Sequence, residues 1–126
     1  ERISQIKKNT DLLIIKAISI EKEKDIEFIK KFENVADMLL FDSKPEKKIK
    51  SPGGNAKTFD WDLLKNININ KPWFLSGGLS INNIHNALEK TQASLLDISS
   101  GVEVIRGKKD LILMEKFVRK VREFKK

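Results

Sequence analysis

The chain has 126 residues and is 40% hydrophobic, which is enough to bury the core of one domain or of part of one. It contains no cysteine, which excludes disulfides, a thiolate nucleophile and cysteine-bound metals within these residues, and its single histidine argues against a histidine metal site. No apolar run approaches the roughly 20 residues that span a bilayer, and the first residues lack a signal-peptide pattern. We therefore expect a cytoplasmic protein that binds no metal.

The formal net charge is +7, which favours an anionic partner such as nucleic acid, an anionic membrane or a phosphorylated metabolite. The lysines are spread along the chain and alternate with acids, as in Glu21 to Asp25. Dense basic stretches occur only over Lys44 to Lys50 and at the C-terminus. We interpret most of the charge as solvated surface, and charge alone does not choose among the three partners.

Short apolar runs of strand length alternate with segments whose apolar residues recur at helical spacing. In chain order, this pattern predicts the end of a helix over 1–9, a buried strand over 12–18, a helix over 23–32, a strand over 36–42, a long loop over 43–58, a short helix over 60–64, a strand over 72–76, a helix over 81–89 capped by Ser80, a strand over 94–99 and an amphipathic helix from 111 to 124.

Strands that are apolar on both faces and separated by helices predict a parallel sheet covered by helices. An open doubly wound sheet and a closed βα-barrel both fit this pattern. Glycine-bearing turns after the last two strands favour the barrel, because barrels commonly bind phosphate with the loops after strands seven and eight. Four strands cannot close a barrel, so the sequence predicts an α/β protein of the TIM-barrel type with only about the last four βα units, strands five to eight.

Two successive predicted strands are followed by glycine. Gly77-Gly78 lets the backbone approach a ligand without a Cβ in the way, and a helix beginning near Ser80 would direct free N–H groups at an anion. The alternative is a tight turn that needs only a positive φ. Ser99-Ser100-Gly101 repeats the arrangement one strand later and adds hydroxyl donors. The repetition favours a phosphate site.

Two carboxylates lie at or near strand ends. Asp42 ends an apolar strand, where a carboxylate is costly unless it is hydrogen-bonded, paired or used in catalysis. Asp42 is therefore interpreted either as a general acid or as a structural cap on a loop amide. Asp97 lies between Leu96 and Ile98, so alternation places it on the opposite face of the strand. It points either into a barrel interior or toward a salt bridge with a helix.

The loop Pro52 to Thr58 differs from a nucleotide-binding P-loop, because Ala56 stands where that motif needs glycine and no strand directly precedes it. We interpret it as a mobile basic lid. His85 has polar neighbours and is expected on the surface. Trp61 and Trp73 are expected to serve packing, because neither lies in a basic aromatic ladder for single-stranded nucleic acid.

The order of these motifs resembles the phosphoribosylanthranilate isomerase family over essentially the whole chain. The segments that carry the resemblance are Leu39-Leu40-Phe41-Asp42-Ser43-Lys44, Gly53-Gly54-Asn55-Ala56-Lys57-Thr58-Phe59-Asp60-Trp61, Pro72-Trp73-Phe74-Leu75-Ser76-Gly77-Gly78-Leu79, and Asp97-Ile98-Ser99-Ser100-Gly101-Val102-Glu103 with Gly107 and Lys109-Asp110. Lys16-Ala17-Ile18 resembles the family's fifth strand.

The resemblance implies an eight-stranded βα-barrel of tryptophan biosynthesis. Such a barrel converts N-(5-phosphoribosyl)anthranilate into 1-(2-carboxyphenylamino)-1-deoxyribulose 5-phosphate by an Amadori rearrangement, with no metal or organic cofactor. It implies that Asp42 is the general acid that protonates the ribose ring oxygen. The other implied contacts are backbone amides to the substrate phosphate from Gly77, Gly78, Ser100 and Gly101, and substrate contacts from Asp97 and the lid residue Lys57.

The chain departs from the family pattern at three points. The family's base is a cysteine on the first strand, and this chain has no cysteine. Asn55-Ala56 replaces the usual threonine or serine plus glycine of the lid. Strands one to four are missing. We therefore expect residues 1–126 to be the C-terminal half of a single βα-barrel domain, either a fragment or a natural half-barrel, and to be inactive without the N-terminal half.

The expected partner is a phosphorylated small molecule, with no nucleic acid and no membrane. Exposed edge strands predict self-association or pairing with the missing N-terminal half. Two other functions are open. A non-catalytic phosphate-binding or assembly module would keep the glycine loops without the chemistry, and a nucleic-acid binder would show affinity that falls steeply with salt.

Overall fold

The centre of the structure is a sheet of four parallel strands. The computed structural model describes residues 2–43 and 57–124. The strands pair in their order along the chain: β1 (Ile15–Ile20), β2 (Met38–Ser43), β3 (Trp73–Leu75) and β4 (Leu95–Leu96). This confirms the predicted α/β fold with parallel strands. The predicted basic stretch over 44–50 and the glycines of the predicted lid lie outside the described residues.

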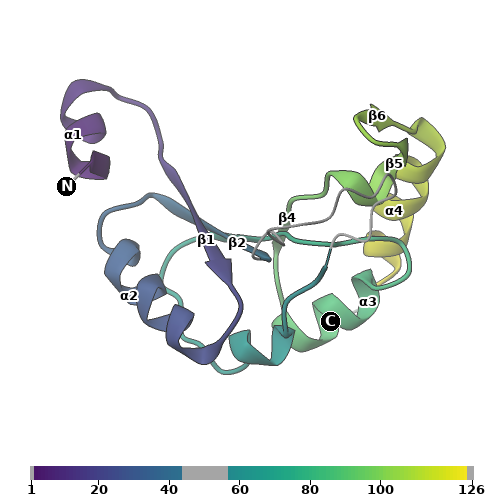
Figure 1. The fold of residues 1–126 in the computed structure, drawn as a ribbon, viewed down its shortest axis with the longest axis horizontal. Helices are drawn as coiled ribbons and strands as arrows, with labels where there is room; N and C mark the ends of the chain where they lie inside the picture. Colours follow the sequence, from purple (N-terminus) through teal and green to yellow (C-terminus); the bar gives the residue numbers. More distant parts are fainter. Residues whose placement is uncertain (1, 44–56, 125–126) are drawn as a thin grey trace.

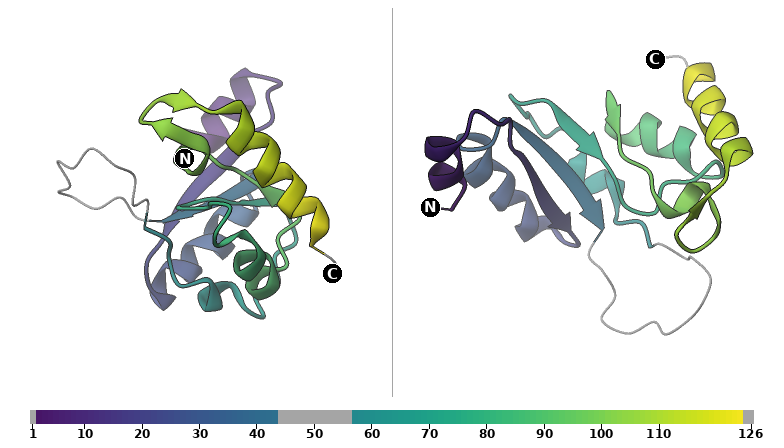
Figure 2. Two further views of the ribbon diagram at one scale, coloured as in Figure 1. Left: turned by 90° about the vertical axis from the view of Figure 1, so that its right-hand side faces the viewer. Right: turned by 90° about the horizontal axis from the view of Figure 1, so that it is seen from above.

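Helical segments connect the strands and follow the last of them. Figure 1 shows the elements in an arc, with α2 and α3 on one side of the sheet, and the right-hand view of Figure 2 places α1 and α4 at opposite ends. The bounds are α1 (Arg2–Asn9), η1 (Glu23–Ile26), α2 (Glu27–Glu33), η2 (Trp61–Leu64), α3 (Ile84–Thr91), η3 (Ser100–Val102), β5 (Glu103–Ile105), β6 (Lys108–Lys109) and α4 (Leu111–Glu123).

The apolar core lies between the sheet and its helices. Its fully buried large side chains are Ile20, Leu39, Phe41, Leu75, Ile29 and Ile84. Side chains alternate across a strand, so the residues between the buried ones lie on the other face of the sheet. That inner face includes Ala17, which is exposed, and Leu40 and Phe74, which are half-buried. Only one face of the sheet is therefore fully covered by the described residues.

The first strand begins later than its apolar run predicts. The prediction of a buried strand over 12–18 is wrong at its start, because β1 begins at Ile15 and Leu12 and Leu13 are 70% and 73% exposed. Among the described residues β1 pairs only with β2, so it is an edge strand. Apolar residues before an edge strand have nothing here to pack against, which sequence periodicity does not reveal.

The helix predicted to begin at Ile81 with Ser80 as its cap begins instead at Ile84, after Asn83. The Asn83 side chain accepts the Ser80 N–H at 2.8 Å, and its Nδ2 donates to the Gly78 carbonyl at 2.8 Å. These bonds hold residues 81–83 in a turn. The predicted cap was wrong because the asparagine side chain binds back to the glycine turn.

The strand predicted over 94–99 spans only Leu95–Leu96, and the hairpin of β5 and β6 was not predicted. The hairpin pairs Glu103 with Lys109 and turns at Gly107, whose φ is +82°. Strands of two or three residues are too short to show a period of two in the sequence. A short antiparallel hairpin after a parallel strand therefore left no clear sequence signal.

The predictions for the two tryptophans and for His85 had different outcomes. Trp61 is buried and the rings of Phe41 and Trp73 lie 5.1 Å apart, which confirms the packing roles of the two tryptophans. His85 is half-buried, which makes the surface prediction wrong. Its Nε2 lies 2.7 Å from the Lys120 carbonyl oxygen and its ring 5.7 Å from that of Phe124, so it joins α3 to α4 and the residue that follows α4.

Glu33 is a buried carboxylate that ties α2 to the segment before β3. It accepts the Asn70 N–H and, at 3.2 Å, an N–H of Lys30. The Asn70 N–H and then the Lys30 ammonium lower the pKa of Glu33 below its ordinary 4.5. Because the pKa of Glu33 is lower in the folded state, the ionised carboxylate stabilises the fold fully above the pKa of the unfolded chain. This stabilisation is lost as the pH falls through the pKa of the folded state.

We expect Glu33→Gln to lower the free energy of unfolding by about 1–3 kcal/mol at pH 7, because a charge-assisted hydrogen bond is replaced by a neutral one. The difference from wild type should shrink as the pH falls below about 4.5. Urea unfolding followed by circular dichroism at several pH values measures it. Glu27→Gln, on the exposed face of the same helix, is the control. A difference that is independent of pH would contradict the prediction.

Candidate functional site

The carboxyl ends of β2, β3 and β4 line one polar pocket of about 230 Å³. Parallel strands end at the same edge of their sheet, so loops that are distant in sequence meet there. The pocket is lined by Asp42, Ser43, Ser76, Gly77, Gly78, Leu79, Asp97, Ile98, Ser99, Ser100 and Gly101. Six of the seven residues predicted to form the site are in this list, and Lys57 is not.

Gly77 brings the end of β3 against the end of β2. Its φ is +88°, and a Cβ on it would lie 2.5 Å from the Ser43 nitrogen and 2.8 Å from Asp42 Oδ1. Gly78 also has a positive φ, of +63°. The turn therefore has the positive φ of the tight-turn interpretation, and its backbone lies against the end of β2. Only glycine satisfies both conditions at position 77. The approach of this backbone to a ligand stays a prediction.

Gly101 joins the two glycine loops to each other. A Cβ on it would lie 1.9 Å from the carbonyl oxygen of Leu79, which follows Gly78. The turn after β3 and the turn after β4 are therefore in direct backbone contact. This contact places Gly78 and Ser100 around the same pocket.

The two glycine turns contain backbone donors that line this pocket without a protein acceptor among the described residues. Within the described ranges, the N–H groups of Gly77, Gly78, Ser100 and Gly101 form no hydrogen bond with a protein acceptor. Successive N–H groups in turns of this kind make an anion-binding concavity. The predicted helix N-terminus at Ser80 does not contribute, since α3 begins only at Ile84. The turns themselves are the source of the donors.

The two predicted carboxylates both face the pocket. Asp42 is half-buried at the end of β2, with its Oδ1 3.5 Å from the Ser43 hydroxyl. Asp97 follows β4 directly and accepts a hydrogen bond from Ser76 Oγ at 3.0 Å. Asp97 therefore lines the pocket at the strand ends, and no ion pair from it to a helix is found within residues 2–43 and 57–124. Its bond to Ser76 fixes its position.

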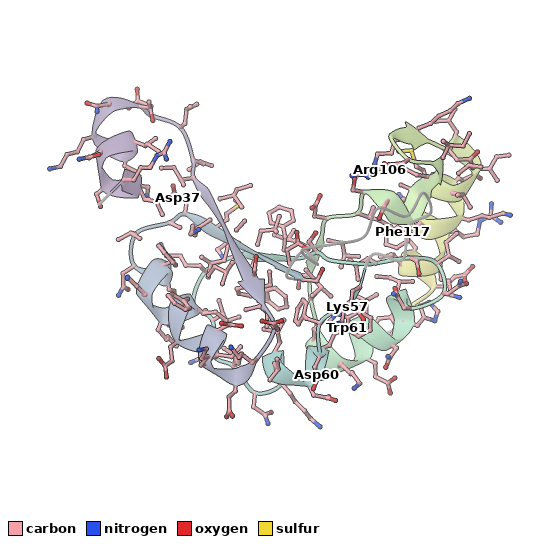
Figure 3. The ribbon with its side chains drawn as sticks, viewed as in Figure 1. Asp37, Lys57, Asp60, Trp61, Arg106 and Phe117 are labelled. Carbon is pink, nitrogen blue, oxygen red and sulfur yellow. The ribbon has the colours of Figure 1, made fainter. Side chains whose placement is uncertain are left out.

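The predicted lid residue is not among the residues that line the pocket. Lys57 is exposed and precedes η2, in the segment that Figure 3 labels at Lys57, Asp60 and Trp61. The other residues of the predicted lid, 52–56, lie outside the described residues. The role of Lys57 at the substrate therefore remains a prediction.

Four polar residues of this region were not predicted as site residues, namely Ser43, Ser76, Ser99 and Lys109. Ser76 holds Asp97, and Ser99 lines the pocket while its Oγ accepts an N–H of Lys109 at 2.9 Å. The alternation of β3 places Ser76 on the same face as Phe74, so strand periodicity could have found it. The contact from Lys109 depends on the unpredicted hairpin, and no sequence pattern indicates it.

The described ranges contain neither a candidate metal cluster nor a candidate membrane span. No group of three or more histidine, aspartate or glutamate side chains there could hold a metal ion. None of the helices found in residues 2–43 and 57–124 has the length and apolarity to cross a membrane. The groups that line the pocket are backbone N–H groups, hydroxyls and two carboxylates.

Together these observations define a class: an α/β protein with parallel strands whose polar pocket, at the carboxyl edge of the sheet, combines anion-binding turns with carboxylates. The family model for N-(5'-phosphoribosyl)anthranilate (PRA) isomerase matches residues 1–120. The chain belongs to this family.

Curated relatives agree with this assignment. The N-(5'-phosphoribosyl)anthranilate isomerase of Beijerinckia indica is 45% identical over 123 residues, which cover 98% of this chain and 55% of the relative. That of Brucella canis is 45% identical over 121 residues, covering 96% and 54%. The chain spans about half the length of the curated relatives it matches.

Solved structures share the fold. Phosphoribosyl anthranilate isomerase from Thermotoga maritima has a TM-score of 0.79 and 31% identity, covering 97% of this chain and 58% of that one. A phosphoribosyl anthranilate isomerase in complex with reduced 1-(o-carboxyphenylamino)-1-deoxyribulose 5-phosphate has a TM-score of 0.71 and 26% identity, covering 94% and 52%.

The contact at Gly77 can be tested against a matched glycine. Gly77→Ala and Gly107→Ala both place alanine at a positive φ, which costs about 1–2 kcal/mol. Nothing lies within 4 Å of a Cβ on Gly107, whereas a Cβ on Gly77 overlaps the end of β2. We expect Gly77→Ala to be more destabilising by a further 1–3 kcal/mol or so in urea unfolding, through overpacking. Equal decreases in the free energy of unfolding of the two variants would show that the close contact between Gly77 and the end of β2 is absent.

Proposed function

We propose that this chain supplies the general acid and the phosphate site of a phosphoribosylanthranilate isomerase, and that residues 1–126 form the C-terminal half of a single βα-barrel domain. The reaction is the Amadori rearrangement of N-(5-phosphoribosyl)anthranilate to 1-(2-carboxyphenylamino)-1-deoxyribulose 5-phosphate. The observation that carries the proposal is one pocket lined by Asp42 and by both glycine turns. The family membership supports the choice of substrate.

The substrate phosphate is held in this proposal by the two turns. The N–H groups of Gly77, Gly78, Ser100 and Gly101 donate to its oxygens, and the Ser100 hydroxyl lines the same pocket. Backbone donors in rigid turns need little reorganisation when an anion arrives. Phosphate binding therefore anchors one end of the substrate while the ribose ring extends toward the carboxylates.

Asp42 acts as the proton donor. It protonates the ribose ring oxygen as the bond from that oxygen to C1 breaks, so the nitrogen lone pair forms a Schiff base with C1. Loss of the C2 proton to a base then gives an enolamine, which tautomerises to the ketose. Asp97, oriented by Ser76 Oγ at 3.0 Å, faces the anthranilate and sugar.

The base comes from outside these residues. By resemblance to the family it is a cysteine, and this chain has none. The chain also spans 55% of the Beijerinckia indica relative. Large apolar side chains at the edge of the sheet support a covering partner, since Leu12, Leu13 and Ile15 are 70%, 73% and 50% exposed. We propose that the N-terminal half of the domain covers them and completes the active site in the cytoplasm.

A non-catalytic phosphate-binding module is the second candidate. The observation that favours it is the absence of cysteine from a chain whose phosphate loops are complete. Phosphate binding by the chain alone fits both candidates, so the decisive observation is turnover after the N-terminal half is added.

The association of the chain can be measured directly. We expect the isolated chain to form dimers or larger assemblies at micromolar concentration, because its apolar edge at Leu12, Leu13 and Ile15 is exposed. Adding the N-terminal segment of the Beijerinckia indica relative should convert them to a one-to-one complex with isomerase activity. Size exclusion with light scattering measures the mass. A clean monomer that ignores the added segment would contradict the pairing.

The role of Asp42 is tested in that completed domain. We expect Asp42→Asn to lower kcat by about a hundredfold to ten-thousandfold, because the proton donor is lost. Affinity for a non-reacting ribose phosphate should change less than about twofold, since the phosphate donors remain. The loss of anthranilate fluorescence gives the rate. Asp11→Asn removes an exposed carboxylate and is the control. Turnover like that of the wild type in Asp42→Asn would refute the assignment.

A further inference from the structure

A lysine outside the pocket contacts one of the pocket's serines. Lys109 Nζ lies 2.9 Å from Oγ of Ser99, which lines the pocket after β4. The same Nζ lies 2.5 Å from Oε1 of Glu103, its partner across the hairpin. The other Glu103 oxygen accepts the Gly107 N–H at 2.8 Å. The hairpin therefore holds the lysine at a defined position beside the pocket.

The pocket lining itself contains no cation among the described residues. Its charged members are Asp42 and Asp97, and the others are neutral. A phosphate bound to the backbone N–H groups would therefore share the pocket with two carboxyl groups. Like charges in a partly desolvated site repel strongly, so positive charge nearby strengthens phosphate binding. Lys109 is a cation that hydrogen-bonds to the lining.

The direction of the bond determines what Ser99 can do. A serine hydroxyl has one O–H donor, and its oxygen can accept. Because the Ser99 oxygen accepts from the Lys109 ammonium, its own hydrogen is free to turn to an acceptor in the pocket. Donation from a charged group polarises the hydroxyl and strengthens its next hydrogen bond. A phosphate oxygen is an acceptor of the kind that this polarised donor favours.

We propose that Lys109 is a positioning residue for the substrate phosphate, which acts by polarising the Ser99 hydroxyl toward it, and that Glu103 holds and partly neutralises this lysine. The inference rests on the proposed function, because it assigns two more residues to the proposed phosphate site. Glu103 is well placed for this restraint, since the Lys109 ammonium and then the Gly107 N–H lower its pKa and keep it ionised near neutral pH.

Titration of the full chain with inorganic phosphate, by calorimetry at low salt, tests the inference. We expect Lys109→Met to weaken phosphate binding about tenfold, because a charge-assisted donor is lost. Lys108→Met removes the same charge from the neighbouring residue, which forms no hydrogen bond with Ser99 in the part of the chain that the structure describes. It should change phosphate binding less than about twofold. Lys109→Arg should retain most of the affinity. Added salt should reduce the difference in phosphate affinity between Lys109→Met and the wild type, since the Lys109 side chain is 44% exposed.

Glu103→Gln separates electrostatics from structure. It removes the negative charge that neutralises the ammonium, but the glutamine carbonyl oxygen can still accept the hydrogen bond of Lys109 and hold it in place. Phosphate should therefore bind as tightly as in wild type or more tightly. A structural role for the pair predicts weaker binding in both variants, and that result would overturn the inference. If Lys109→Met unfolds in a thermal melt, Ser99→Ala gives the test without disturbing the hairpin. It should weaken binding severalfold, and wild-type affinity would overturn the inference.

Failure of the proposed function gives a different result. In the completed domain Lys109→Met should raise KM about tenfold and leave kcat nearly unchanged, the reverse of Asp42→Asn. If the completed domain binds phosphate but does not isomerise the substrate, the proposed function fails and the phosphate titrations still decide the role of Lys109. Wild-type phosphate affinity in Lys109→Met overturns the inference whatever the activity. A wild-type chain that binds no phosphate overturns it as well.

Discussion

The pocket depends on the contact between Gly77 and the end of β2. With a positive φ and no Cβ, Gly77 turns the chain out of β3 within contact distance of Ser43 and Asp42. A side chain at this position would push the two strand ends apart. Because the strands are parallel, this contact lies at the edge of the sheet where all the loops after the strands meet. One residue without a side chain thus brings a carboxylate next to a turn rich in backbone donors.

A second backbone contact extends the pocket to the next strand. Gly101 packs against the Leu79 carbonyl, and Asn83 holds the first turn by bonding to Gly78. Asp97 is fixed through Ser76. The pocket is therefore built from short, rigid connections, which suits a site that must hold an anion without reorganisation. In the proposed function, this rigidity positions the phosphate while the carboxylates face the reacting sugar.

The sheet itself is covered on one face only by the described residues. Side chains toward α2 and α3 are buried, whereas Ala17, Leu40 and Phe74 on the other face are exposed or half-buried. The apolar residues at the start of β1 are exposed as well. The chain spans about half the length of its curated relatives. In the proposed function, the N-terminal half of the domain covers this surface. In the proposed function, the active site is therefore shared between this chain and the rest of the domain.

Sequence alone determined the parallel α/β order, because apolar runs of strand length alternated with helical periods. It also predicted that Asp42 and the glycine turns stand at strand ends, where carboxylates are costly and glycines allow unusual turns. Tertiary structure decided the rest. The start of α3 depends on the Asn83 side chain, the exposure of Leu12 depends on the edge of the sheet, and the link from Lys109 to Ser99 depends on a hairpin too short to have a period. Each of these depends on which residues lie close to one another in space, and no local sequence pattern records that.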